Sequence, residues 1–66
     1  MQVTINGRYE ELKGGINVEN VLLNYKIKPE GVVVELNQKI IRRDEWQKIV
    51  IKENDIIELI SFVGGG

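Results

Sequence analysis

The stretch Ile56-Ile57-Glu58-Leu59-Ile60-Ser61-Phe62-Val63 decides the fold. Its apolar residues lie on both faces of an extended strand, with Ile57, Leu59 and Val63 on one face and Ile56, Ile60 and Phe62 on the other. A strand that is apolar on both faces is usually central in its sheet. We therefore expect residues 56–63 to form a long central strand that other strands flank.

The first strands are predicted at the N-terminus. Residues 1–5 alternate polar and apolar side chains, with Val3 and Ile5 on one face. Asn6-Gly7 follows, and this dipeptide favours a type I′ hairpin turn because both residues tolerate positive φ. The chain is expected to return as a strand over residues 8–13.

A short helix is predicted next. Asn17 is a suitable N-cap. One apolar face follows at helical spacing, formed by Val18, Val21, Leu22 and Tyr25. Pro29 makes continuation unfavourable. About two turns of helix need a sheet to pack on.

A second hairpin is expected from residues 31–36 and 40–41, followed by a helical turn that Asp44 caps and an extended piece over residues 49–51. Hairpin, helix, hairpin and central last strand form an α+β, ubiquitin-like β-grasp fold. We expect a mixed sheet of about five strands packed against one short helix. The last strand would lie parallel to the first, between the two hairpins. Residues 1–63 are predicted to form the domain and residues 64–66 a flexible tail.

Composition excludes several kinds of function. Nine basic and ten acidic residues give a net charge of −1, without the basic excess typical of nucleic-acid binders. The chain has no His and no Cys, and Ser61 and Thr4 are its single Ser and Thr. A Ser-His-Asp or Cys-His catalytic device cannot be built, nor can the usual zinc site. We predict no metal site and no enzymatic activity of the chain's own.

The sequence also bears on location. No apolar run approaches the ~20 residues that cross a bilayer, and residues 1–6 lack the basic and apolar regions of a signal peptide. We expect a cytoplasmic protein that binds neither membrane nor nucleic acid.

Three glycines, Gly64-Gly65-Gly66, follow the predicted central strand directly. They have no side chains to pack and a high entropic cost of ordering. One interpretation is a frayed end of an interaction module. The other is a segment slim enough to enter a narrow channel in a partner, with the α-carboxylate of Gly66 as the reacting group.

The sequence resembles the thiamine-biosynthesis sulfur carrier proteins (the ThiS type) over essentially its whole length. One part of the resemblance is residues 32–37, Val-Val-Val-Glu-Leu-Asn, with residues 40–46, Ile-Ile-Arg-Arg-Asp-Glu-Trp. The more specific part is the ending, residues 54–66, Asn-Asp-Ile-Ile-Glu-Leu-Ile-Ser-Phe-Val-Gly-Gly-Gly. Arg42 replaces a proline common in the family and Asn54 replaces a glycine, and neither change touches the tail.

The resemblance implies a carrier mechanism. A partner adenylyltransferase of the ubiquitin-activating type would use ATP and Mg²⁺ to adenylate the carboxylate of Gly66. Sulfur derived from cysteine, through a persulfide of a cysteine desulfurase system, would then give a thiocarboxylate that thiazole synthase consumes. The carrier itself would bind no cofactor.

The residues beside the tail are the candidate partner-binding residues: Phe62, Val63, Gly64 and Gly65. Phe62 is predicted to be an interface residue rather than a core residue, because an apolar patch at the base of a threading tail suits docking. Trp46 is interpreted as covering a core edge, with an interface role as the alternative. Two functional alternatives also stand: a sulfur carrier for molybdopterin or amino-acid synthesis, and a β-grasp interaction module with an inert tail.

Overall fold

The computed structural model describes residues 1–62. In chain order the elements are β1 (Gln2–Ile5), β2 (Arg8–Glu11), α1 (Val18–Asn24), η1 (Pro29–Gly31), β3 (Val32–Leu36), β4 (Lys39–Ile41), η2 (Arg43–Glu45) and β5 (Ile56–Ser61). Val63 and the tail at residues 64–66 lie outside the described residues, so the predicted boundary between domain and tail stays a prediction.

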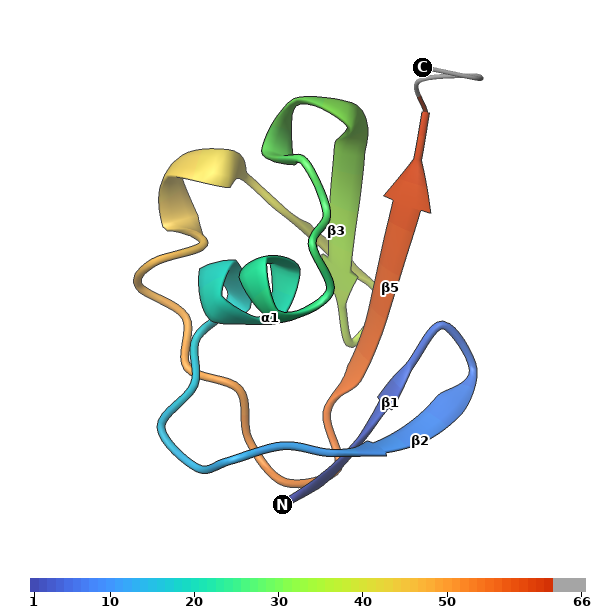
Figure 1. Ribbon diagram of the computed structural model, residues 1–66, viewed down its shortest axis with the longest axis vertical. Helices are drawn as coiled ribbons and strands as arrows, with labels where there is room; N and C mark the ends of the chain where they lie inside the picture. Colours follow the sequence, from blue (N-terminus) through green and yellow to red (C-terminus); the bar gives the residue numbers. More distant parts are fainter. Residues whose placement is uncertain (63–66) are drawn as a thin grey trace.

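The five strands form one mixed sheet in the order β2-β1-β5-β3-β4. β5 pairs in parallel with β1 and antiparallel with β3, so it lies between the two hairpins. Figure 1 shows α1 and the long connecting segments on one side of this sheet. The predicted β-grasp fold, with its central last strand, is confirmed.

The core lies between α1 and the sheet. Ile5 of β1, Val34 of β3 and Ile57 of β5 face the helix, and Val21 and Leu22 of α1 pack against them. The remaining buried residues of this cluster are Val3, Val18, Val32, Trp46 and Ile51. This single layer is the only buried apolar cluster found within residues 1–62, so apolar burial on one face of the sheet stabilises the fold.

The first turn of α1 is capped as the sequence predicts. Asn17 Oδ1 accepts a hydrogen bond from Asn20 N at 2.8 Å, and Asn20 Oδ1 accepts one from Asn17 N at 3.1 Å. This reciprocal pair satisfies two backbone donors at the start of the helix. The helix ends at Asn24, and its C-cap is Tyr25, which is 39% exposed and does not belong to the buried core.

The two hairpin turns and the turn before β5 contain residues with positive φ. Asn6 and Gly7 have φ of 51° and 80°, as a type I′ turn requires. Asn37 and Gln38, between β3 and β4, have φ of 52° and 72°. Asn54, which replaces the common glycine before β5, has φ of 71°. Asparagine tolerates this region better than most residues, so the substitution preserves the turn.

Two local predictions were wrong in detail, and a third was confirmed. β2 ends at Glu11 rather than at residue 13. The helical turn near Trp46 is a 3₁₀ turn that begins after Arg42, where Glu45 Oε1 accepts a hydrogen bond from Arg42 N at 3.3 Å, so Asp44 is not its cap. The extended piece predicted at residues 49–51 is present, and it forms a single antiparallel bridge, Asn17 to Val50, with the segment before α1.

Candidate partner-binding site

Two asparagine side chains hold β5 between the hairpins. Asn6 Oδ1 accepts a hydrogen bond from Leu59 N at 2.7 Å, and Asn37 Oδ1 accepts one from Ile56 N at 2.9 Å. Asn37 Nδ2 also donates to Asp55 Oδ1 at 3.0 Å. Both turns are thereby attached to the strand that leads to the chain end. Sequence reasoning predicted the turns but missed these bonds, although Asn is the residue that combines tolerance of positive φ with an amide oxygen.

The face of the sheet opposite α1 is not covered by any element of residues 1–62. The strand register places Val33 directly opposite Ile60 and Glu35 directly opposite Glu58 on this face. We call it the open face, formed by Gln2, Thr4, Tyr9, Glu11, Val33, Glu35, Ile40, Ile56, Glu58, Ile60 and Phe62. Six of these eleven side chains are apolar or aromatic, and all of these six except Tyr9 belong to β3, β4, β5 or the residue after β5. Contiguous exposed apolar patches mark interaction surfaces.

Phe62 stands at the end of the open face, directly after β5. Its backbone N–H donates to the carbonyl of Gly31 at 3.2 Å, which extends the pairing with β3 by one step. Its side chain is nevertheless 61% exposed. A fixed backbone with an exposed aromatic side chain is the arrangement of a preformed docking residue. A core position is excluded, and the predicted role in partner binding stays a prediction.

The other predicted site residues, Val63, Gly64, Gly65 and Gly66, lie outside the described residues. The structure therefore brings Phe62 together with the open face, which sequence reasoning had not described as a surface.

Trp46 is a core residue. It is 3% exposed, and its Nε1 donates a hydrogen bond to the carbonyl of Ile41 at 3.2 Å. This bond satisfies the indole N–H that burial would otherwise leave unpaired. Arg42, four residues earlier, pairs with Asp44 at 3.2 Å on the surface. The interpretation of Trp46 as a residue that covers a core edge is confirmed.

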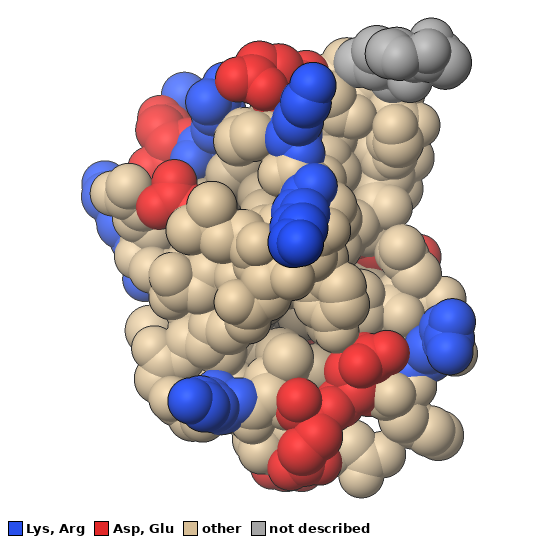
Figure 2. All heavy atoms as spheres, in the orientation of Figure 1, with Lys and Arg blue, Asp and Glu red and all other residues tan. Residues whose placement is uncertain are grey.

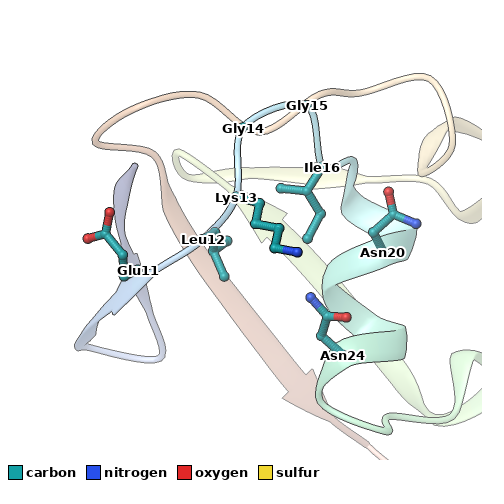
Figure 3. A pocket seen from close by; sticks show the side chains of 8 residues that line it. All are labelled: Glu11, Leu12, Lys13, Gly14, Gly15, Ile16, Asn20 and Asn24. Atoms are coloured by element: carbon teal, nitrogen blue, oxygen red, sulfur yellow. The ribbon is translucent and has the colours of Figure 1, made fainter.

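A separate hollow of about 460 Å³ lies between α1 and the loop that follows β2, and Phe62 is not among its lining residues. Figure 3 shows its lining, in which Lys13 and Asn24 point toward one another across the opening. Glu11 and Asn20 are the other polar side chains there. No polar side chain within residues 1–62 is buried, so this hollow has no desolvated group of the kind that binding or catalytic sites use.

Two further observations limit the chemistry of the chain. Within residues 1–62, no group of three or more acidic side chains lies close enough to hold a metal ion. None of the helices formed by these residues is long and apolar enough to cross a membrane. The exposed apolar surface around β5 is the feature that the geometry favours as a functional site.

Comparison with known proteins identifies the family. The family model for ThiS matches residues 3–66. The chain belongs to the ThiS family. A crystal structure of a ThiS thiamine biosynthesis protein from Geobacter metallireducens superposes with a TM-score of 0.85 at 33% identity, covering 100% of both chains. The sulfur carrier protein ThiS of Bacillus subtilis is 33% identical over 49 residues, which are 74% of each chain.

A larger relative matches the ThiS chain as well. The thiazole synthase of Magnetococcus marinus is 33% identical over all 66 residues of this chain. Those residues are 20% of that protein, so the chain spans about a fifth of its length. A segment like this ThiS chain is therefore part of the same polypeptide as a protein named for thiazole synthesis.

Proposed function

We propose that this chain is a sulfur carrier protein of thiamine biosynthesis that carries sulfur as a thiocarboxylate on Gly66. The observation that supports the proposal is the central place of β5 in the sheet, because Gly66 follows Ser61, the last residue of this strand, by only five positions in the sequence. Membership of the ThiS family supports it.

The chemistry follows from the limits of a carboxylate. Its carbonyl shares a negative charge, so it is a poor electrophile. A partner adenylyltransferase of the ubiquitin-activating type, with ATP and Mg²⁺, converts the Gly66 carboxylate to an acyl-adenylate and releases pyrophosphate. The terminal sulfur of a persulfide then attacks the acyl carbon and displaces AMP. A thiol cleaves the resulting acyl disulfide and leaves the thiocarboxylate.

The thiocarboxylate sulfur is the product that a synthase consumes. Thiazole synthase is the proposed acceptor, because the Magnetococcus relative that bears this name includes a segment similar to the whole chain. Physical linkage of two modules raises the effective concentration of one at the other. This observation favours thiamine synthesis over molybdopterin or amino-acid synthesis.

The chain's own part is presentation rather than catalysis. The sequence contains no His or Cys, so a Cys nucleophile or a His general base in these steps comes from the partners. The open face supplies an apolar docking area, and Phe62 lies at the point where the chain leaves it. We place these steps in the cytoplasm, where ATP and reducing thiols are available.

Intact-mass analysis tests the proposal. The chain is incubated with its activating enzyme, ATP, Mg²⁺ and a persulfide donor with a thiol. We expect the mass of one sulfur in place of one oxygen, located by fragmentation in the peptide that contains Gly66. Sulfur found elsewhere in the chain, or none with a competent cognate enzyme, contradicts the proposal and favours the interaction module with an inert tail.

A further inference from the structure

The last residues of β5 have an unpaired edge. The backbone groups of even-numbered residues in β5 and of Phe62 point toward β3: Asn37 N donates to Ile56 O at 2.8 Å and Phe62 N to Gly31 O at 3.2 Å. The backbone groups of odd-numbered residues point toward β1: Asn6 N donates to Ile57 O at 2.9 Å. Because this direction alternates along an antiparallel ladder, the N–H and C=O groups of Leu59 and Ser61 also point to the β1 side.

The β1–β2 hairpin is too short to cover that side. β1 pairs with β5 only at Ile56 and Ile57, and the side chain of Asn6 then reaches the N–H of Leu59. Beyond that bond the hairpin has turned back. Within residues 1–62, no group bonds to the carbonyl of Leu59 or to the N–H and carbonyl of Ser61. In Figure 1 nothing flanks this upper part of β5 on the side away from β3.

This edge also lacks the usual protection. Exposed strand edges are normally guarded by charged side chains, proline or bulges, because they recruit other strands. Residues 59–62 contain none of these charges or prolines, and Ser61 is exposed. Figure 2 shows an uncharged surface along this part of β5, with the charged side chains gathered elsewhere in the view. An unguarded edge in a native protein indicates a binding function or an aggregation risk.

We infer that the edge of β5 at residues 59–61 binds an extended segment of the enzyme that modifies Gly66, adding one short strand to the sheet by backbone hydrogen bonds. This inference rests on the proposed function. Gly66 is four residues beyond Phe62, and four extended residues span at most about 14 Å. An enzyme whose reacting atoms reach Gly66 therefore lies within about 14 Å of Phe62, close enough for one of its segments to pair with this edge.

Two features of the site define the partner segment. The free groups are two acceptors and one donor, which main-chain groups of an added strand can satisfy in the manner of β-augmentation. Side chains of the added strand alternate between the two faces. Those on the open-face side would lie next to Ile60 and Phe62, so we expect them to be apolar. The carrier thus contributes backbone recognition in addition to its apolar face.

Hydrogen exchange measured by NMR tests this inference on the complete chain. In the free chain, the Ser61 amide is expected to exchange fast, while the Phe62 amide, bonded to Gly31, exchanges slowly. Adding the activating enzyme without ATP should slow the Ser61 amide at least tenfold. The Phe62 amide is the internal control, since its bond exists in both states.

A pair of variants tests the same bond by rate. Ser61→Pro removes the N–H that faces the partner and leaves the bonds to β3 intact, and proline is tolerated at a strand edge of this kind. Ser61→Ala keeps the N–H and removes only the hydroxyl. In ATP–pyrophosphate exchange, we expect kcat/KM to fall about tenfold for Ser61→Pro, as for one unsatisfied hydrogen bond, and less than twofold for Ser61→Ala.

The outcomes separate the edge from the proposed function. If pyrophosphate exchange is normal but the Ser61 amide stays unprotected in the complex, the inferred binding at the edge is wrong, while the proposed sulfur-carrier function still stands. If protection of the Ser61 amide increases with the concentration of the chain in the absence of enzyme, a second copy of the chain binds the edge, and this result also contradicts the inference. If Ser61→Pro fails to fold, hydrogen exchange of the Ser61 amide in the unaltered chain decides whether the edge binds the enzyme. Protection at Ser61 without any pyrophosphate exchange supports the edge and counts against the carrier.

Discussion

Phe62→Ala should separate docking from folding, and Ile57→Ala, within β5, is its matched control. Phe62, directly after β5, is 61% exposed and Ile57 is 1% exposed. These two apolar residues thus differ mainly in the face of the sheet that they occupy. We expect the first substitution to weaken partner binding with little loss of stability, and the second to do the reverse.

The magnitudes follow from these exposures. Full burial of a side chain such as Phe contributes about 1.5–3 kcal/mol, and the folded chain covers about two fifths of Phe62. Phe62→Ala should therefore lower the free energy of unfolding by about 1 kcal/mol. Ile57→Ala removes a buried side chain and should cost about 2–5 kcal/mol. A domain of this size is stable by only about 3–10 kcal/mol, so the control variant will be partly unfolded at modest urea concentrations.

Urea unfolding followed by the fluorescence of Trp46 measures the stability, because this buried residue becomes exposed on unfolding. Affinity for the activating enzyme is measured in parallel. Loss of an aromatic anchor should raise Kd about tenfold or more. The reasoning would be refuted by a stability loss for Phe62→Ala as large as that for Ile57→Ala, with affinity unchanged.

Three further predictions address other parts of the molecule. Asn6→Gly keeps the positive φ of the turn but removes the acceptor for Leu59 N–H, so it should lower the free energy of unfolding by about 1 kcal/mol. Asn6→Asp keeps an acceptor and is the control. Equal urea midpoints for the two variants would contradict this prediction. One residue added after Gly66 shifts the carboxylate by up to ~3.5 Å, and should abolish ATP–pyrophosphate exchange without changing the melting curve; full exchange activity would favour the inert tail. Burial, and then the negative charge of Glu10, raise the pKa of Tyr25 above 10.0, so the folded state holds that proton more tightly than the unfolded chain. The resulting stability is present below pH 10 and is lost as pH rises through the pKa of the folded state, and Tyr25→Phe should lose less stability on going from pH 9 to pH 11; identical pH profiles would be the contrary result.

The fold was predictable because its signals are local. Asn6-Gly7 requires a tight turn, Asn17 begins a helix whose Val18, Val21 and Leu22 share one face, and residues 56–61 read as a central strand. These signals agree with one another, and such agreement is what specifies a fold.

The candidate site was less predictable because it depends on pairing between distant residues. Apolar residues on both faces of β5 indicate its central place in the sheet. They do not show that α1 covers only one face and that the face carrying Ile60 stays exposed. The bond from Leu59 to Asn6 joins residues 53 apart in sequence, and no periodicity reports it. The free edge at Ser61 depends on where the first hairpin ends relative to β5, which only the register shows.

The central place of β5 also governs how the domain forms during synthesis. Both hairpins leave the ribosome before residues 56–61, and they pair with β5 rather than with each other. Until that strand emerges, the two hairpins have no strand between them and the core lacks Ile57, and the pairing of β1 with β5 must wait for nearly the whole sequence. The open face and the end of β5 come into existence in the same step. An enzyme that recognises both surfaces would therefore act only on chains whose folding is finished, and a truncated carrier would not be charged with sulfur.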